Sequence, residues 1–169
     1  MTRLPEIRAT NFGGNDLRGK DLRGNDLRGP TPRIETVREE AIVPINLDTD
    51  IVSARHKSRE LAAKTGFSFI ELTLIATAVS ELARNIVLYG GGGEIHLKLV
   101  ENGTHRGIVV VARDQGRGIA DIPRALQDGY STSGSLGLGL PGTRRLMDEF
   151  EILSTEGKGT TVTVKKWKR

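Results

Sequence analysis

The sequence predicts an α+β protein, a two-layer sandwich in which helices cover one face of a mixed, mainly antiparallel sheet. Two long helical patterns occupy the first half of the chain. A tight-turn signal between two apolar runs follows them, and two short alternating runs end the chain after a glycine-rich loop. Because helices and hairpin strands come in separate groups, a sheet covered on one side is the expected architecture.

The globular pattern is expected to begin with a strand and a helix. The run 41–45 has the pattern of a strand end, and Pro44 makes it an edge strand because proline has no N–H to donate. Asp48 or Thr49 is expected to cap a helix that continues to about Thr65.

A second helix and a hairpin are expected next. The helix begins at Ser68 and runs to about Tyr89, where consecutive glycines end it. The strands 94–100 and 107–113 follow, joined by a turn whose Asn102-Gly103 pair suits a tight hairpin. The remaining predicted elements are a short helix at 122–126, a helix at 140–150, and strands at 151–154 and 160–167.

The first 32 residues are expected to form a flexible tail, separate from a folded domain at 33–169, and a docked coil is the alternative. One coil of a repeat cannot bury its own apolar face without stacked neighbours. Here apolar residues recur every five positions, a spacing that resembles a pentapeptide repeat of about one coil: Phe12, Leu17, Leu22 and Leu27.

The composition excludes several classes of site. Cysteine is absent and the histidines are scattered, so disulfides, thiolate nucleophiles and cysteine zinc sites are excluded. The net charge is +4, but only 4% of residues are aromatic, which disfavours nucleic-acid binding. No apolar run reaches about 18 residues and the N-terminus lacks a secretory pattern, so we expect a cytoplasmic protein without a membrane segment.

Within the second helix, Glu81 and Asn85 depart from the apolar pattern. Residues such as Ile75, Val79 and Leu82 follow the spacing of a core stripe, whereas Glu81 and Asn85 fall together on the opposite side, one turn apart. An ordinary solvated glutamate with a capping asparagine is one interpretation. Because a buried carboxylate without a partner is costly, a polar group lying against it is the other.

Glycine-rich segments follow in the second half of the chain. Asp114 stands at a strand end and is followed by Gly116 and Gly118, which permit a sharp turn that points the carboxylate toward the second helix. Gly137 and Gly139 precede a helix and offer free N–H groups to phosphate oxygens. Taken singly, each segment is a common turn or loop.

In this order, and with a Gly-Lys-Gly-Thr turn that ends at Thr160, the motifs resemble the four boxes of the GHKL ATP-binding superfamily, whose domain is the Bergerat fold. The resemblance covers about residues 34–169. Within that superfamily the chain is similar to the serine/threonine kinases that act as switches of the bacterial stressosome. The supporting segments are 51–55, 78–86, 128–134, 139–142 and 145–150.

The resemblance implies a role for each motif, with ATP and Mg²⁺ as cofactors. Glu81 would be the general base that takes the proton of the attacking serine or threonine hydroxyl. Asn85 would bind the metal through its amide oxygen. The nucleotide would be held by Asp114 at the adenine amino group, Thr160 near the base, Gly116 and Gly118 beside it, and Gly137 and Gly139 at the phosphates.

The same resemblance implies partners and leaves alternatives open. The expected substrate is a serine on a STAS-domain antagonist, with a stressosome scaffold and a PP2C-type phosphatase as further partners. A binding module that uses the nucleotide only to set its shape and works by docking is the alternative. The lid arginine of related kinases is replaced by the stretch 133–136, so Arg144, Arg145 or the N–H groups of the lid alone would take its place. Clamp ATPases and histidine kinases are disfavoured, since the chain offers neither a transducer domain nor a preceding dimerisation helix.

Overall fold

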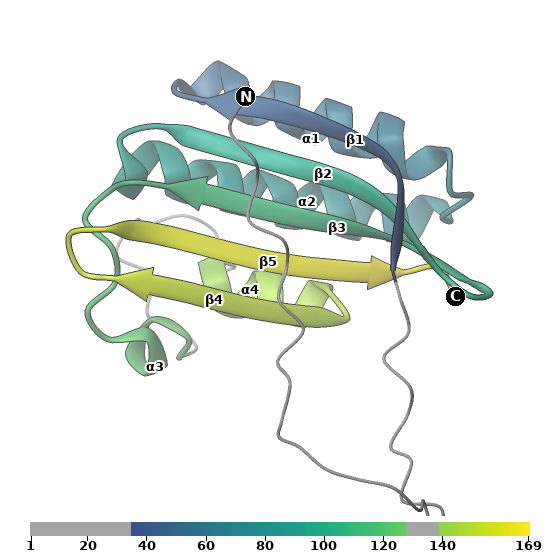
Figure 1. The fold of residues 1–169 in the computed structure, drawn as a ribbon. Coiled ribbons are helices and arrows are strands. Elements are labelled where there is room, and N and C mark those ends of the chain that lie inside the picture. The colour runs from purple at the N-terminus through teal and green to yellow at the C-terminus, as the bar shows by residue number, and fades with distance from the viewer. Residues whose placement is uncertain (1–34, 128–138) are drawn as a thin grey trace, which may run out of the picture. The chain divides into compact units, whose positions relative to one another are not determined.

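A computed structural model describes residues 35–127 and 139–169 as a five-stranded sheet in the order β1-β2-β3-β5-β4. Every pairing between these strands is antiparallel, and helices α1, α2 and α4 lie on one face of the sheet (Figure 1). The predicted α+β class is therefore confirmed, and the described strands include no parallel pair. The elements are β1 (Thr36–Ile45), α1 (Asp48–Ala63), α2 (Phe69–Asn85), β2 (Gly93–Asn102), β3 (His105–Asp114), α3 (Ile122–Ala125), α4 (Gly139–Leu146), β4 (Glu149–Thr155) and β5 (Gly159–Trp167).

The core lies between the sheet and α2. Alternate residues of the strands face the helices, as the two-residue period of a strand requires. The predicted stripe of α2 is confirmed, since Ile75, Val79 and Leu82 are all at most 1% exposed. The sheet contributes fully buried apolar side chains to the same cluster: Ile45, Ile95, Leu97, Ile108, Val110 and Val164.

The stretch Phe69–Gly90 is long and apolar enough to cross a membrane, judged by length and composition alone. In the structure it is the central helix of the helical layer, lying between α1 and α4 against the sheet. Core packing thus accounts for its apolar character.

The beginnings of the two long helices differ in how well the sequence predicted them. Ser68 caps α2 as expected, since its side chain accepts a hydrogen bond from Glu71 N and Glu71 accepts one from Ser68 N. Asp48 and Thr49 were the wrong caps for α1, whose N-cap is Leu47. There the Asp50 carboxylate accepts the Leu47 N–H at 2.9 Å, so an acid inside the first turn replaces a capping side chain.

The predicted end of α2 combines two structures. The α-helix stops at Asn85, and a π-helical turn, Ile86–Gly90, carries the chain to Gly91. Gly91 has φ +65°, the left-handed conformation that glycine adopts readily at a helix end. A π-helical turn inside a helix is uncommon and often accompanies a functional site.

The predicted hairpin is confirmed with a shift of one residue at its tip. Asn102 still pairs with His105 at the end of the ladder, so the loop contains only Gly103 and Thr104. β1 is an edge strand as expected from Pro44, because it pairs with β2 alone.

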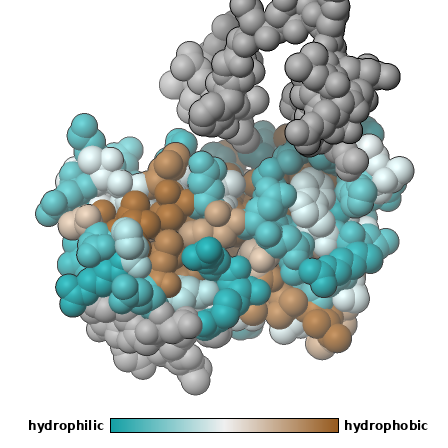
Figure 2. All heavy atoms as spheres, turned by 90° about the horizontal axis from the view of Figure 1, so that it is seen from below, coloured by the Kyte–Doolittle hydropathy of each residue, from teal (hydrophilic) through white to brown (hydrophobic). Residues whose placement is uncertain are grey.

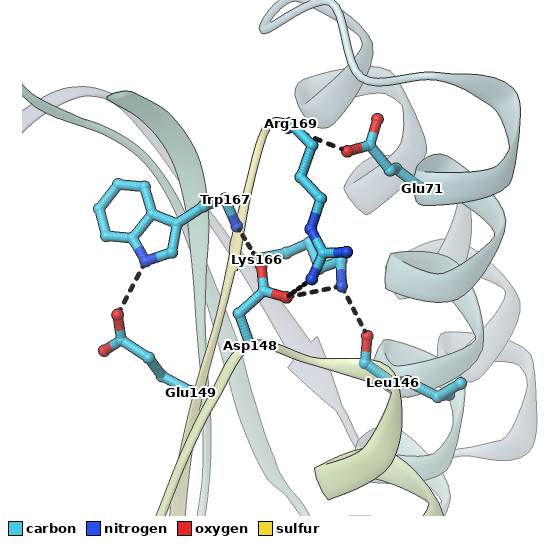
Figure 3. Close-up of polar contacts among 7 residues, drawn as sticks. All are labelled: Glu71, Leu146, Asp148, Glu149, Lys166, Trp167 and Arg169. Atoms are coloured by element: carbon cyan, nitrogen blue, oxygen red, sulfur yellow. Dashed lines mark hydrogen bonds and ion pairs between the residues drawn. The ribbon is translucent and has the colours of Figure 1, made fainter. Parts of the chain in front are cut away.

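The helix predicted at 140–150 was too long, because α4 ends at Leu146 and the following residues enter β4. The reason is a set of polar contacts around Asp148, drawn in Figure 3. Asp148 N donates to the Lys165 carbonyl at 2.9 Å, and its carboxylate accepts from Lys166 Nζ at 2.9 Å and Trp167 N at 2.8 Å. These bonds fix the chain against the end of β5 instead of continuing the helix.

Candidate active site

The end of α2 is in direct contact with the loop after β3. A Cβ atom built on Gly90 would lie 2.5 Å from the Cβ of Asp114, and one built on Gly116 would lie 2.3 Å from the Tyr89 carbonyl oxygen. The Arg117 guanidinium also lies 5.0 Å from the centre of the Tyr89 ring, a favourable cation–π contact. Two segments far apart in sequence therefore meet where only glycine leaves room.

Asp114 is held in one orientation by backbone donors. Its Oδ1 atom accepts hydrogen bonds from Gly116 N at 2.9 Å and from Thr160 N at 3.2 Å. Its Oδ2 atom has no hydrogen-bond donor among the described residues, and the side chain is half-buried. The carboxylate thus presents one oxygen with its accepting capacity unused.

Gly118 is required by the packing of the loop on the β4–β5 hairpin. It has φ +70°, and a Cβ there would lie 2.2 Å from the Thr155 carbonyl oxygen. Gly159, in the same hairpin, comes equally close to the backbone of Asp114. The Arg117 carbonyl accepts a hydrogen bond from Gly157 N at 2.8 Å. Close packing within the protein thus explains why Gly116 and Gly118 are glycines, in addition to their predicted roles beside the adenine ring.

Glu81 and Asn85, here called the α2 pair, lie half-buried one turn apart on α2. Neither side chain makes a hydrogen bond or ion pair with another described residue. At the rise of a helix they stand about 13 and 7 Å before Gly90, which contacts Asp114. The pair and Asp114 therefore form a line that an extended nucleoside triphosphate can follow. The surroundings of the α2 pair are less apolar than expected, because the nearby Leu88 side chain is 51% exposed to solvent.

Thr160 lies opposite Ser154 in the β4–β5 ladder, and their hydroxyl oxygens are 2.8 Å apart. Ser154 was missed by sequence reasoning because its partner becomes visible only when the strand register is known. Gly90 was also missed, since its place in a run of glycines had been explained by the end of the helix alone. Gly137 lies outside the described residues, and Gly139 is the first residue of α4, with φ +41°.

The two arginines expected to replace the missing lid arginine, Arg144 and Arg145, both lie in α4. Arg145 lines an open hollow with Asp148 and Trp167. Trp167 lies seven residues from Thr160 along β5, about 23 Å at the rise of a strand, so Arg145 lies away from the adenine end of the site. Between the two members of the α2 pair, Arg84 has a buried Nε atom without a hydrogen-bond partner.

An open cavity of about 310 Å³ lies beside Asp114 and Thr160, at the ends of β3, β4 and β5. Arg113 and Leu153 also line it. Because successive residues of a strand point to opposite faces, these two belong to the face away from the helices. The α2 pair does not line this cavity, so the contacts between α2, Asp114 and Thr160 define the candidate site instead.

Comparison with known proteins identifies the family of this chain. The sequence matches the histidine kinase-like ATPase domain family over residues 44–166. It is 46% identical to the serine/threonine-protein kinase RsbT of Bacillus subtilis (strain 168) over 133 residues, which are 79% of this chain and 100% of that kinase. It is 35% identical to the anti-sigma F factor of Thermoanaerobacter sp. (strain X514) over 120 residues, 68% of this chain and 82% of that factor.

A solved structure supports the fold. The crystal structure of the RsbU and RsbW domains of a Mycobacterium tuberculosis protein is similar with a TM-score of 0.53 and 20% identity, covering 78% of this chain and 33% of that one. The family match spans most of the described residues, and the similarity to RsbT extends over the whole of that kinase. The chain therefore belongs to the histidine kinase-like ATPase domain family and is an RsbT-like serine/threonine kinase.

Proposed function

We propose that the protein transfers the γ-phosphoryl group of ATP to a serine of a STAS-domain antagonist and, once released, activates a second partner. The observation that carries the proposal is the contact between Gly90 and Asp114. It joins the end of the helix that bears the α2 pair to a carboxylate held in one orientation. One end of that line suits a purine and the other suits phosphoryl transfer.

Glu81 has the properties of a general base. Its carboxylate is half-buried and has no partner among the described residues, so its oxygens are available to accept a proton. In the proposed reaction the serine hydroxyl oxygen bonds to the γ-phosphorus, the bond from that phosphorus to the bridging oxygen breaks, and ADP leaves. The hydroxyl proton passes to Glu81.

Asn85 fits the role of a magnesium ligand. Its amide makes no hydrogen bond to a described residue, so the amide oxygen is available, and magnesium accepts one or two protein oxygens beside water and phosphate. No group of three or more histidine, cysteine or acidic side chains that could hold a metal occurs among the described residues. Magnesium held there would offset phosphate charge.

The nucleotide would be bound at the other end of the site. Asp114 offers its Oδ2 atom to the amino group of adenine, and Thr160 adds a hydroxyl beside it. Gly116 and Gly118 keep the loop close to the base. For Gly137, outside the described residues, and Gly139 we propose contacts to the phosphates through backbone N–H groups.

A protein substrate also requires a docking surface. Figure 2 shows hydrophobic side chains gathered into a patch among hydrophilic ones on the face seen from below. The described surface exposes large apolar side chains, with Phe69 73% and Leu47 65% exposed. Contiguous apolar patches mark protein contacts, so the patch in Figure 2 is the docking surface that we propose. The partners we propose are an RsbS-like STAS protein on an RsbR-like scaffold and an RsbU-like PP2C-type phosphatase, all met in the cytoplasm.

Labelled ATP with Mg²⁺ and an RsbS-like protein tests this proposal. Glu81→Gln should slow labelling of the partner by about 100-fold or more while ATP still binds, because the proton acceptor alone is lost. Glu60→Gln is the matched control, since Glu60 is an exposed helical glutamate paired with Lys57. Labelling by Glu81→Gln at the wild-type rate would remove Glu81 from the proposed role.

A binding module that uses the nucleotide only to set its shape is the second candidate. The stretch 133–136, which replaces the lid arginine, favours it, as does the similarity to anti-sigma F factors. The two functions differ in one measurement. A kinase leaves phosphate on the partner after mixing, and a binding module forms a nucleotide-dependent complex with an unmodified partner.

A further inference from the structure

The Ser154 hydroxyl is the centre of a hydrogen-bond network behind Thr160. Ser154 Oγ accepts the Ile119 N–H at 2.9 Å and lies 3.0 Å from the Gly159 carbonyl oxygen. The Thr160 hydroxyl is 2.8 Å away on the opposite strand. Ser154 therefore ties the loop after β3, the β4–β5 turn and Thr160 together.

The direction of each hydrogen bond follows from counting protons. A serine hydroxyl has one proton to donate and two lone pairs to accept with. A carbonyl only accepts, so the Ser154 proton goes to Gly159, and the Ile119 N–H fills one lone pair. The contact with Thr160 is then a hydrogen bond only if Thr160 donates. The opposite direction would leave one of the three contacts unmade.

Thr160 consequently has no proton left for a ligand and presents lone pairs alone. Asp114 is in the same position, because its Oδ1 takes two backbone N–H groups and its ionised Oδ2 can only accept. This wall of the site thus offers two acceptors and no side-chain donor. A 6-amino purine has two N–H donors at that edge, whereas a 6-oxo purine has a carbonyl oxygen there.

We propose that Ser154 is a positioning residue that sets the preference for 6-amino over 6-oxo purine nucleotides by fixing the direction of the Thr160 hydroxyl. The inference rests on the proposed nucleotide site. When Ser154 is absent, the Thr160 hydroxyl can rotate and donate to a 6-oxo group. The preference for 6-amino over 6-oxo purine nucleotides then falls. The charge of the site stays the same, because Ser154 and Thr160 are both uncharged.

The test compares dissociation constants of ATP and inosine triphosphate, with Mg²⁺, for the full chain. In the wild type, the dissociation constant of inosine triphosphate should exceed that of ATP. Ser154→Ala should lower the ratio of the inosine triphosphate constant to the ATP constant about tenfold, which corresponds to roughly one hydrogen bond, and Ser154→Thr should restore the ratio. In a Thr160→Val background, Ser154→Ala should leave the ratio unchanged, because its effect passes through the threonine. Ser58→Ala, which removes another hydroxyl that bonds a carbonyl, controls for general destabilisation.

The outcomes separate this inference from the proposed function. A wild-type protein that binds no ATP would overturn both. Equal weakening of both nucleotides by Ser154→Ala, or an unchanged ratio, would overturn the role of Ser154 and leave the kinase proposal standing. Should Ser154→Ala fail to fold, Thr160→Val alone remains decisive, because loss of the acceptor must weaken ATP more than inosine triphosphate.

Discussion

Substitution of Gly116 by alanine is the sharpest test of how the site is built. The added Cβ would lie 2.3 Å from the Tyr89 carbonyl oxygen and 2.6 Å from the Gly90 Cα, both backbone atoms that no side-chain rotation can move away. Overpacking of this kind costs about 1–3 kcal/mol in the free energy of unfolding. The displaced loop would also pull the Gly116 N–H from Asp114, so the dissociation constant of ATP should rise about tenfold or more.

Gly107→Ala, in the strand β3 that precedes the loop, provides a matched control. Its Cβ would lie 2.6 Å from the Trp167 ring and 2.7 Å from the Lys166 carbonyl oxygen, at the end of β3 away from Asp114. Both variants should lose similar stability in urea unfolding, whereas only Gly116→Ala should weaken ATP in calorimetry. If Gly116→Ala binds ATP as tightly as Gly107→Ala, the contact between α2 and the loop does not position the carboxylate.

Two further predictions concern the rest of the chain. Burial raises the pKa of Asp148, but the Trp167 N–H and the Lys166 ammonium outweigh it and hold the pKa below its ordinary value. In urea unfolding, the wild type should therefore be more stable than Asp148→Asn by about 2 kcal/mol near neutral pH. This difference should shrink as the pH falls below about 4, because protonation of Asp148 removes the charge that its partners stabilise. A difference that is unchanged at pH 3 would contradict the prediction. Removal of residues 1–30 should leave ATP affinity within about twofold by calorimetry, because every proposed contact lies between Glu81 and Thr160. A larger loss would assign the tail a part in binding.

The elements that the sequence predicted well are those governed by local chemistry. The capping serine and the apolar period define α2, and the Asn-Gly pair defines the β2–β3 hairpin to within one residue. The errors occur where a distant partner decides. Asp148 ends α4 because Lys166 and Trp167 hold it against β5, and no local pattern between 140 and 150 records that contact.

The residues of the candidate site also fall into two groups, those that the local sequence reveals and those that depend on a distant partner. Glu81, Asn85 and Asp114 were recognisable because a polar residue in an apolar pattern, or an acid before glycines, is visible in the chain itself. Ser154 was not, since an ordinary serine in a strand gains its meaning from the residue across the ladder. The assignment of the tail at 1–32 and of Gly137 concerns residues outside those that the structure describes, so both stay predictions.

The glycines around Asp114 allow close packing of the backbone, in addition to the roles that their motifs imply. Gly90 and Gly159 approach the side chain or backbone of Asp114 more closely than any Cβ allows, and Gly116 in the Asp114 loop approaches the end of α2 equally closely. The loop is therefore clamped between the end of α2 and the β4–β5 turn, and its carboxylate is oriented before any ligand arrives. Preorganisation of this kind spares the ordering cost on binding. It also links the two ends of the site, because a shift at Gly90 must move both Asp114 and the helix that carries Glu81.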